Sequence, residues 1–306
     1  MYIRKIRNSF FLAMALMGSM TFATDDFVFQ EKNSQINCGD IILVNTKLDH
    51  DLLDCPGDGL TIGADNVILD GNGHTIDGQG AGNGVTANSR NGVIIKKLRV
   101  SEFSNGISFY DTNTSIIRKS DLAKNHTGVR LASSNENVVN ENNVSDNYLG
   151  IRVLLSSNAN TIAKNTVTGT TANAVNLQYS SENIVGRNTL LNNARGISLY
   201  MSDDNTIRKN DVSKSIVNGF RLVSSTGNAF TENMSQHNGG DGFNVDAASS
   251  GNTFGKNRSE SNAGWGFIDL TSGSTGDAGT DNMYTKNRCE DNNLGGSSPF
   301  GLCEFK

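Results

Sequence analysis

A small residue followed by an apolar one recurs along the chain at an almost constant interval of 22 to 24 residues. The recurring pairs are Gly84-Val85, Gly106-Ile107, Gly128-Val129, Gly150-Ile151, Ala174-Val175, Gly196-Ile197, Gly219-Phe220, Gly242-Phe243 and Gly266-Phe267. A period of this length indicates an internal structural repeat.

Apolar and polar residues alternate within each repeat. Arg152 separates Ile151 from Val153, and this period of two is typical of a β-strand. One repeat accommodates three short strands, for example at residues 151–155, 161–163 and 165–167, and leaves no room for a helix of ordinary length. The pattern therefore predicts an all-β fold of about ten stacked coils, in which each strand pairs in parallel with its copy one coil away.

Asparagine recurs in the same period at three places in the repeat. The first row contains Asn137, Asn160, Asn183, Asn205, Asn228, Asn252 and Asn282. The second row contains Asn142, Asn165, Asn188, Asn210, Asn233, Asn257 and Asn287. A looser third row contains Asn125, Asn147, Asn193, Asn238, Asn262 and Asn292. Asparagine tolerates left-handed backbone conformations, and its amide can bond to an identical amide above and below. We expect structural ladders at the corners of the coils.

The repeated strands and asparagine rows resemble the right-handed parallel β-helix (pectin-lyase-like) superfamily, in its version built of short Asn-rich repeats. The resemblance is strong over residues 59–266. Short-repeat β-helices of this kind also resemble the periplasmic accessory protein of nitrous oxide reductase copper maturation. Residues 69–80, LDGNGHTIDGQG, are weakly similar to an early coil of polygalacturonases, although turn chemistry alone favours the same residues.

The two ends of the chain lie outside the repeat. Residues 1–23 combine three cations with an apolar run at residues 10–17 and resemble an export signal, so we expect a secreted or periplasmic protein. Residues 24–58 and 289–306 are predicted caps on a β-helix at residues 59–288, whose first strand is expected at residues 60–62. An oxidising compartment favours the disulfides Cys38 with Cys55 and Cys289 with Cys303. A metal site is the alternative, but neither pair has CxxC spacing.

The net charge limits the classes of partner. It is −5 for the whole chain, and removal of Arg4, Lys5 and Arg7 with the signal lowers it to −8. This balance disfavours nucleic acid. No apolar run after residue 23 is long enough to cross a bilayer, so we expect no membrane insertion. We also expect a monomer.

One outward-facing stripe carries the candidate binding residues. In parallel β-helix enzymes, as the resemblance implies, the substrate lies along the outer face of one sheet. The corresponding positions here include Arg130, Arg152, Arg221, Tyr110, Tyr200, Asn176 and Gln178. Guanidinium groups suit sugar carboxylates or sulfates, and tyrosines can stack on sugar rings. The stripe predicts binding of polysaccharide, including anionic polysaccharide. It does not identify a catalytic residue. The alternative is a solvated face whose arginine stems cover the sheet.

Enzymatic alternatives depend on carboxylates. Asp203 and Asp204, with Glu182 one coil before, are the best match to the polygalacturonase pattern, but they also occupy predicted corners and the histidine and Arg-x-Lys of that pattern are missing. A lyase would need Ca²⁺ near an arginine base, and the candidates are Asp241, Asp246 and Asp269 near Arg221. Asp269 replaces an apolar residue of the other coils, so either the register slips there or a carboxylate turns inward. An insertion rich in Gly, Ser, Thr and Asp follows Asp269, at residues 272–281.

Copper handling is the third alternative. It requires clustered His, Met or free Cys. After residue 23 the candidates are scattered over different coils, and no metal ligand set is predicted: His50, His74, His126, His237, Met201, Met234 and Met283.

Overall fold

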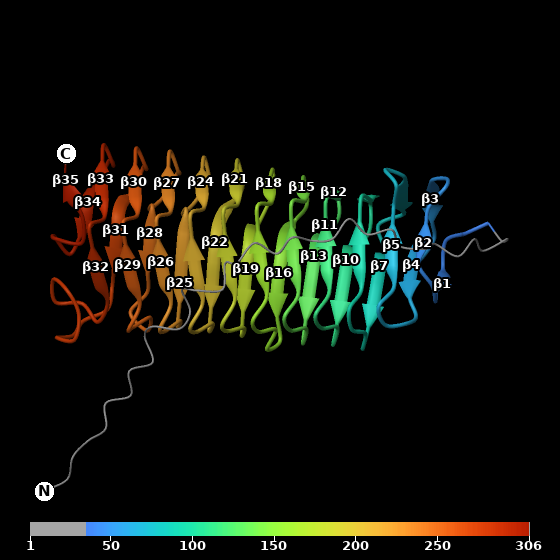
Figure 1. Cartoon of the computed structure of the whole chain (residues 1–306). Helices are drawn as coiled ribbons and strands as arrows, with labels where there is room; N and C mark the ends of the chain where they lie inside the picture. Colours follow the sequence, from blue (N-terminus) through green and yellow to red (C-terminus); the bar gives the residue numbers. More distant parts are fainter. Residues whose placement is uncertain (1–34, 306) are drawn as a thin grey trace, which may run out of the picture.

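The chain folds into three long parallel sheets, which we call sheets A, B and C (Figure 1). The computed structural model describes residues 35–305, and the predicted signal at residues 1–23 lies outside them. Sheet A contains β1 (Asp40–Ile42), β4 (Leu60–Ile62), β7 (Asn83–Asn88), β10 (Asn105–Tyr110), β13 (Thr127–Ala132), β16 (Leu149–Leu154), β19 (Asn173–Gln178), β22 (Arg195–Tyr200), β25 (Phe220–Val223), β28 (Phe243–Val245), β31 (Trp265–Asp269) and β34 (Gly295–Ser298). Sheet B contains β2 (Thr46–Lys47), β5 (Ile68–Asp70), β8 (Ile94–Lys96), β11 (Ile116–Arg118), β14 (Val138–Asn140), β17 (Thr161–Ala163), β20 (Ile184–Gly186), β23 (Thr206–Arg208), β26 (Ala229–Thr231), β29 (Thr253–Gly255) and β32 (Met283–Thr285). Sheet C contains β3 (Leu52–Cys55), β6 (Thr75–Gly78), β9 (Arg99–Ser101), β12 (Asp121–Ala123), β15 (Asn143–Ser145), β18 (Thr166–Thr168), β21 (Thr189–Leu191), β24 (Asp211–Ser213), β27 (Met234–Gln236), β30 (Arg258–Glu260), β33 (Arg288–Glu290) and β35 (Glu304–Phe305).

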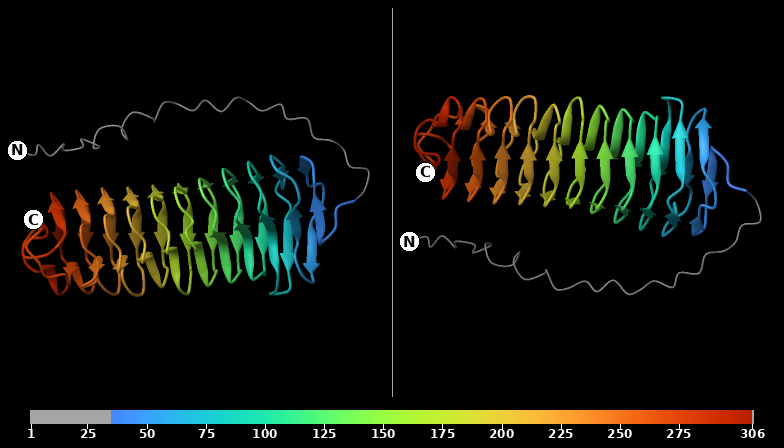
Figure 2. Two further views of the ribbon diagram at one scale, coloured as in Figure 1. Left: turned by 90° about the horizontal axis from the view of Figure 1, so that it is seen from below. Right: turned by 90° about the horizontal axis from the view of Figure 1, so that it is seen from above.

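Each strand pairs with its copy in the next coil. Ile107 pairs with Val129, and Val129 pairs with Ile151, so residues one repeat apart lie above one another. The result is a right-handed parallel β-helix of about ten coils, drawn as an elongated stack of rungs in Figure 2, and it confirms the predicted fold class. Within residues 35–305, no helix is long and apolar enough to span a membrane.

The strand positions follow the alternation in the sequence closely. The expected strand at residues 161–163 coincides with β17, and the one at residues 151–155 overlaps β16. The third begins one residue later than expected, at Thr166, because Asn165 is a buried corner residue. The three strands β1 to β3 precede the strand expected first, β4, and already pair with the next coil.

The core consists of columns of inward side chains. Near the C-terminal end the columns become aromatic. Phe220, Phe243 and Phe267 stack with ring centroids 4.5 and 4.4 Å apart. Phe230, Phe254 and Tyr284 form a second stack, with spacings of 5.0 and 4.8 Å. Because parallel strands hold identical positions one coil apart, the rings of successive coils meet face to face.

The asparagine rows form hydrogen-bonded ladders, as predicted. Asn142 is buried, and its Nδ2 donates to Oδ1 of Asn165 at 3.1 Å and to the carbonyl of Ile117 at 3.0 Å. Its Oδ1 accepts from the backbone N–H of Ser120. The amide therefore satisfies buried backbone groups that the turn leaves without a strand partner.

One physical reason given for these asparagines was wrong. The left-handed residue at each corner is the one before the ladder asparagine, for example Glu141 before Asn142 with a φ of 57°. The ladder residue itself has an ordinary backbone. The sequence signal was thus correct about the hydrogen bonds but misplaced the backbone turn by one position.

A fourth ladder, of hydroxyl groups, follows sheet A. The backbone N–H of each member donates to the hydroxyl of the next, as from Ser134 to Ser157 at 2.9 Å and from Ser180 to Ser202 at 3.2 Å. Its members are Thr112, Ser134, Ser157, Ser180, Ser202, Ser225 and Ser249. The sequence signal for this ladder is the serine that recurs three residues before each asparagine of the first row, from Ser134 to Ser249.

Both expected disulfides are present, Cys38–Cys55 at the first coil and Cys289–Cys303 at the last, and the described residues contain no free cysteine. The question about Asp269 is also answered, because it pairs in register with Val245 and its carboxylate turns inward. The carboxylate accepts from Thr271, Asn282 and the hydroxyl of Tyr284. Burial and this carboxylate raise the pKa of Tyr284 well above its ordinary value.

Candidate functional site

The outward-facing polar residues of sheet A form one continuous row, which we call the arginine row. Successive members pair in register, for example Arg130 with Arg152 and Ser198 with Arg221. The row comprises Ser108, Arg130, Arg152, Asn176, Ser198, Arg221 and Asn244. The structure therefore brings the three predicted arginines and Asn176 onto one face.

Arg130 and Arg152 are half-buried neighbours without a carboxylate partner. Arg152 donates to Oε1 of Gln178 at 2.9 Å, and Arg130 contacts the Ser108 hydroxyl at 3.5 Å. The ion pairs found among residues 35–305 involve neither arginine. Burial, and then the charge of Arg152, lower the pKa of Arg130. Among the described residues, these two neighbouring cations therefore have no carboxylate that neutralises them.

A second outward row runs beside the arginine row. It comprises Tyr110, Ala132, Leu154, Gln178, Tyr200 and Val223, all in register. Tyr110 is 48% exposed, whereas Ala132 and Leu154 are buried. Asp246 does not continue this row, because it follows the end of β28 and accepts hydrogen bonds from the backbone N–H of Ser224 and the hydroxyl of Ser249.

Sequence reasoning missed several residues of this face. Arg195 pairs in register with Asn173, and buried side-chain atoms of both, Arg195 Nε and Asn173 Oδ1, have no hydrogen-bond partner. On the adjacent corner Tyr179 meets Tyr200 edge to face at 5.5 Å. At the other ends of the strands, Tyr148 before β16 stacks on His126 before β13, with ring centroids 4.7 Å apart. These positions carry different residue types in other coils, so no repeated pattern marks them.

The carboxylates proposed for catalysis are held in separate structural roles. Asp203 accepts from the backbone N–H and the hydroxyl of Thr226, and Asp204 is a left-handed corner residue. These contacts agree with their interpretation as corner residues. The set Asp241, Asp246 and Asp269 is not brought together, because Asp269 faces the core and Asp241 bonds to Asn244 and the backbone of Trp265. As a shared calcium site, that set was wrong.

The expected copper-ligand types do not converge either. Met201 follows β22 of sheet A, Met234 lies in β27 of sheet C and Met283 in β32 of sheet B. His50 and His74 each contact an aspartate, Asp49 and Asp51. In the described part of the chain, no group of three or more His, Cys, Asp or Glu is arranged to hold a metal ion.

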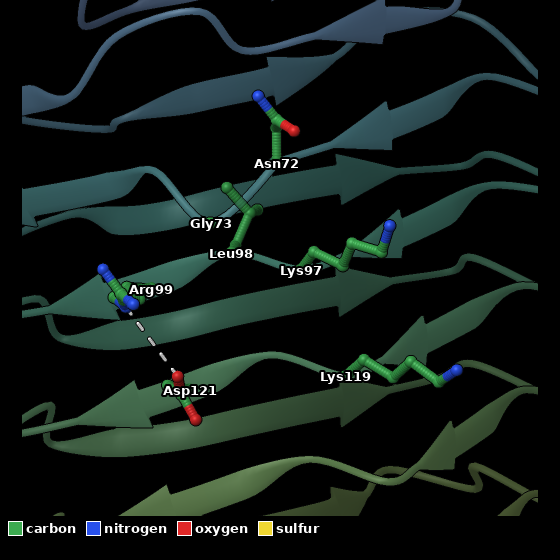
Figure 3. Close-up of a pocket in the computed structure, with 7 residues that line it drawn as sticks. All are labelled: Asn72, Gly73, Lys97, Leu98, Arg99, Lys119 and Asp121. Carbon is green, nitrogen blue, oxygen red and sulfur yellow. Dashed lines mark ion pairs between the residues drawn. The ribbon is translucent and has the colours of Figure 1, made fainter.

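A separate hollow of about 320 Å³ lies where sheet B turns into sheet C, in the early coils (Figure 3). Its lining residues are Asn72, Gly73, Lys97, Leu98, Arg99, Lys119 and Asp121. Nε of Arg99 lies 3.9 Å from Asp121. The hollow is cationic at its rim, but it belongs to a different side of the coil from the arginine row.

The fold and the face together define the class of this molecule as a parallel β-helix protein with an arginine-lined sheet. The chain belongs to the family described as "Periplasmic copper-binding protein (NosD)", which matches residues 65–238, more than half of its length. No curated protein matches the chain. The family is described as periplasmic, and the two disulfides fit an exported protein.

Solved structures with the same fold are distant in sequence. The A-module of mannuronan C-5 epimerase AlgE6 from Azotobacter vinelandii has a TM-score of 0.61 at 13% identity, covering 87% of this chain and 80% of its own. The periplasmic alginate epimerase AlgG has a TM-score of 0.60 at 17% identity, covering 90% and 78%. The Dettilon tailspike protein has a TM-score of 0.66 at 17% identity, covering 85% and 60%. At these identities the likeness shows the fold alone.

Proposed function

We propose that this protein is exported and binds polysaccharide along the outer face of sheet A, with anionic groups of the sugar chain on the arginine row. The observation that carries the proposal is the pair Arg130 and Arg152, which lie side by side and half-buried without a carboxylate. Guanidinium groups in this setting favour a bound anion that replaces the missing counter-charge.

The dimensions of the face suit an extended ligand. Tyr110 in β10 and Arg221 in β25 are five coil steps apart, or about 24 Å at the usual spacing between strands. The similar structures include a mannuronan C-5 epimerase, an alginate epimerase and a tailspike protein, which supports a carbohydrate partner. We propose binding without catalysis, because the carboxylates considered for lyase or hydrolase chemistry have other contacts. We also propose that the protein binds as a monomer.

Copper binding, which the family description names, is the alternative function. It would require His, Met or thiolate ligands that meet at one point. In residues 35–305 the cysteines are in disulfides, and the three methionines lie on different sides of the coil. The donor residues of this part of the chain therefore do not fit a copper site.

The double substitution Arg130→Ala with Arg152→Ala tests the proposal. We expect affinity for alginate or dextran sulfate to fall at least tenfold, because the ligand loses two charge-assisted contacts worth about 1.5 kcal/mol or more each. Affinity electrophoresis and calorimetry measure the change, and the melting temperature should hardly move.

The matched control is Arg118→Ala with Arg208→Ala, which removes two arginines from the strands of sheet B, β11 and β23. This variant should bind as the unmodified protein does. Equal losses in both variants would mean that only overall charge matters, and unchanged retention in the first variant would contradict the proposal.

A further inference from the structure

Three successive coils place a large apolar residue at the corner where sheet A turns toward sheet B. Leu155, Tyr179 and Met201 directly follow β16, β19 and β22, and we call them the corner ridge. Their side chains are 48%, 44% and 43% exposed. They therefore contribute little to the core and present apolar surface to solvent.

The corner ridge conflicts with the local backbone. Its residues have φ values of 58°, 52° and 47°, in the left-handed region that large side chains disfavour. The flanking coils meet the same requirement with small or polar residues, namely Asp111, Ser133 and Ser224. Other corners hold charged residues in the same conformation, such as Lys119 and Arg187, so the exposed apolar side chains are what set the ridge apart and indicate a functional rather than a structural role.

The corner ridge borders the proposed binding face. Met201 directly follows Tyr200, and Tyr179 packs edge to face against the same ring. Hydrogen bonding to Tyr200 raises the pKa of Tyr179. Each ridge residue is three positions along the chain from a member of the arginine row, for example Leu155 from Arg152, or about 10 Å. An apolar wall thus runs parallel to the arginine row.

We propose that the corner ridge is the wall that contacts the ring faces of a bound anionic polysaccharide, while the arginine row binds its acid groups. This inference rests on the proposed function and adds the ligand class: a linear chain lying along the helix axis, with charge on one edge and apolar ring faces on the other. Charge complementarity with Arg130, Arg152 and Arg221 of the arginine row selects an anionic chain over a neutral one.

The triple substitution Leu155→Asn, Tyr179→Asn and Met201→Asn tests the corner ridge. Asparagine tolerates the left-handed backbone, so the melting temperature should stay the same or rise. Affinity for alginate and dextran sulfate should fall at least fivefold, and this loss should persist in 0.5 M salt, because apolar contacts are not screened. The loss in the double arginine variant should instead shrink as salt increases.

The control is Ser133→Asn with Ser224→Asn, at the same corner in the flanking coils, and it should leave affinity unchanged. Absence of binding by the unmodified protein to alginate and dextran sulfate would overturn the proposed function itself. Binding by the unmodified protein with no loss in the triple variant would overturn the corner ridge alone. A large drop in melting temperature, or equal binding to uncharged dextran or to an oligonucleotide, would also overturn this inference.

Discussion

At the scale of single residues, we expect a ladder asparagine to contribute more to the free energy of unfolding than its small side chain suggests. Asn142 and Asn143 are adjacent, yet one is buried within the stack and the other is exposed on β15. The first connects three coils, through Ile117 and Ser120 on one side and Asn165 on the other.

We predict that Asn142→Ala lowers the free energy of unfolding by roughly 2 to 4 kcal/mol, because it leaves two buried backbone groups unpaired, the carbonyl of Ile117 and the N–H of Ser120. Asn143→Ala should change it by less than about 0.5 kcal/mol. Denaturant unfolding followed by circular dichroism measures both. Similar effects from the two substitutions would show that the ladder hydrogen bonds are not what stabilises the corner.

Single residues also show how far the sequence could predict the site. Arg130 and Arg152 could be predicted to be neighbours, because each follows the same glycine-apolar pair and the repeat fixes their register. Arg195 could not, because Asn, Thr and Leu occupy its position in earlier coils. The corner ridge was missed because turn residues follow no alternation of apolar and polar positions.

At the scale of elements, the first coil is held by a histidine as well as by a disulfide. Nε2 of His50 lies 2.9 Å from the carbonyl of Ile36, and Nδ1 contacts Asp49. The hydrogen bond to Asp49 raises the pKa of His50 above 6.5, and the same contact lowers the pKa of Asp49 below 3.8. The protonated ring can donate to both oxygens at once.

We predict that the first coil is more stable at pH 5.5 than at pH 8.5. The folded pKa of His50 is raised, so its contribution is complete below pH 6.5 and is lost as pH rises through that raised value. Asp49 limits the window on the acid side, where its contribution is lost as pH falls through its lowered pKa. Protection of the β1 amides against hydrogen exchange, corrected for intrinsic rates, measures the difference.

His50→Gln should abolish this pH dependence while leaving the amides of β13 unaffected. A pH dependence that survives the substitution would assign the effect to another group of the cap.

For the whole molecule, stability is that of a one-dimensional stack, in which each coil contacts only the next. Within residues 35–305 the outer edges of the first and last coils have no neighbouring coil, so these ends are the weak points. The disulfides Cys38–Cys55 and Cys289–Cys303 lie at these ends, across sequence separations of 17 and 14 residues. Loops of this length are stabilised by about 3 kcal/mol in the chain-entropy model.

We predict that reduction opens the molecule from its ends. With both disulfides reduced, amides of β3 and β33 should exchange faster, whereas those of β13 to β19 should keep their protection. Mass spectrometry of exchanged peptides resolves the regions. A uniform loss of protection along the chain would show that the stack unfolds as one cooperative unit instead.

The fold of the whole molecule could be predicted because every coil repeats the same pattern of apolar, polar and asparagine positions. A misleading residue in one coil is therefore outweighed by the other coils. Function is not repeated in this way. The proposed function depends on departures from the repeat, such as the arginine pair and the corner ridge, and such a departure occurs only once, so no other coil offers a copy with which to check it. The family assignment names copper, while the described residues offer no converging donors for it.

The ladder bonds also tolerate unequal spacing. Asn137 and Asn160 are 23 residues apart, Asn252 and Asn282 are 30 apart, and both pairs make the same contact, at 3.1 and 3.0 Å. The extra residues between Asn252 and Asn282 form a loop outside the coil, and the hydrogen bond between the two asparagines is unaffected. Loops at the surface of this scaffold can therefore lengthen during evolution independently of the gain or loss of whole coils.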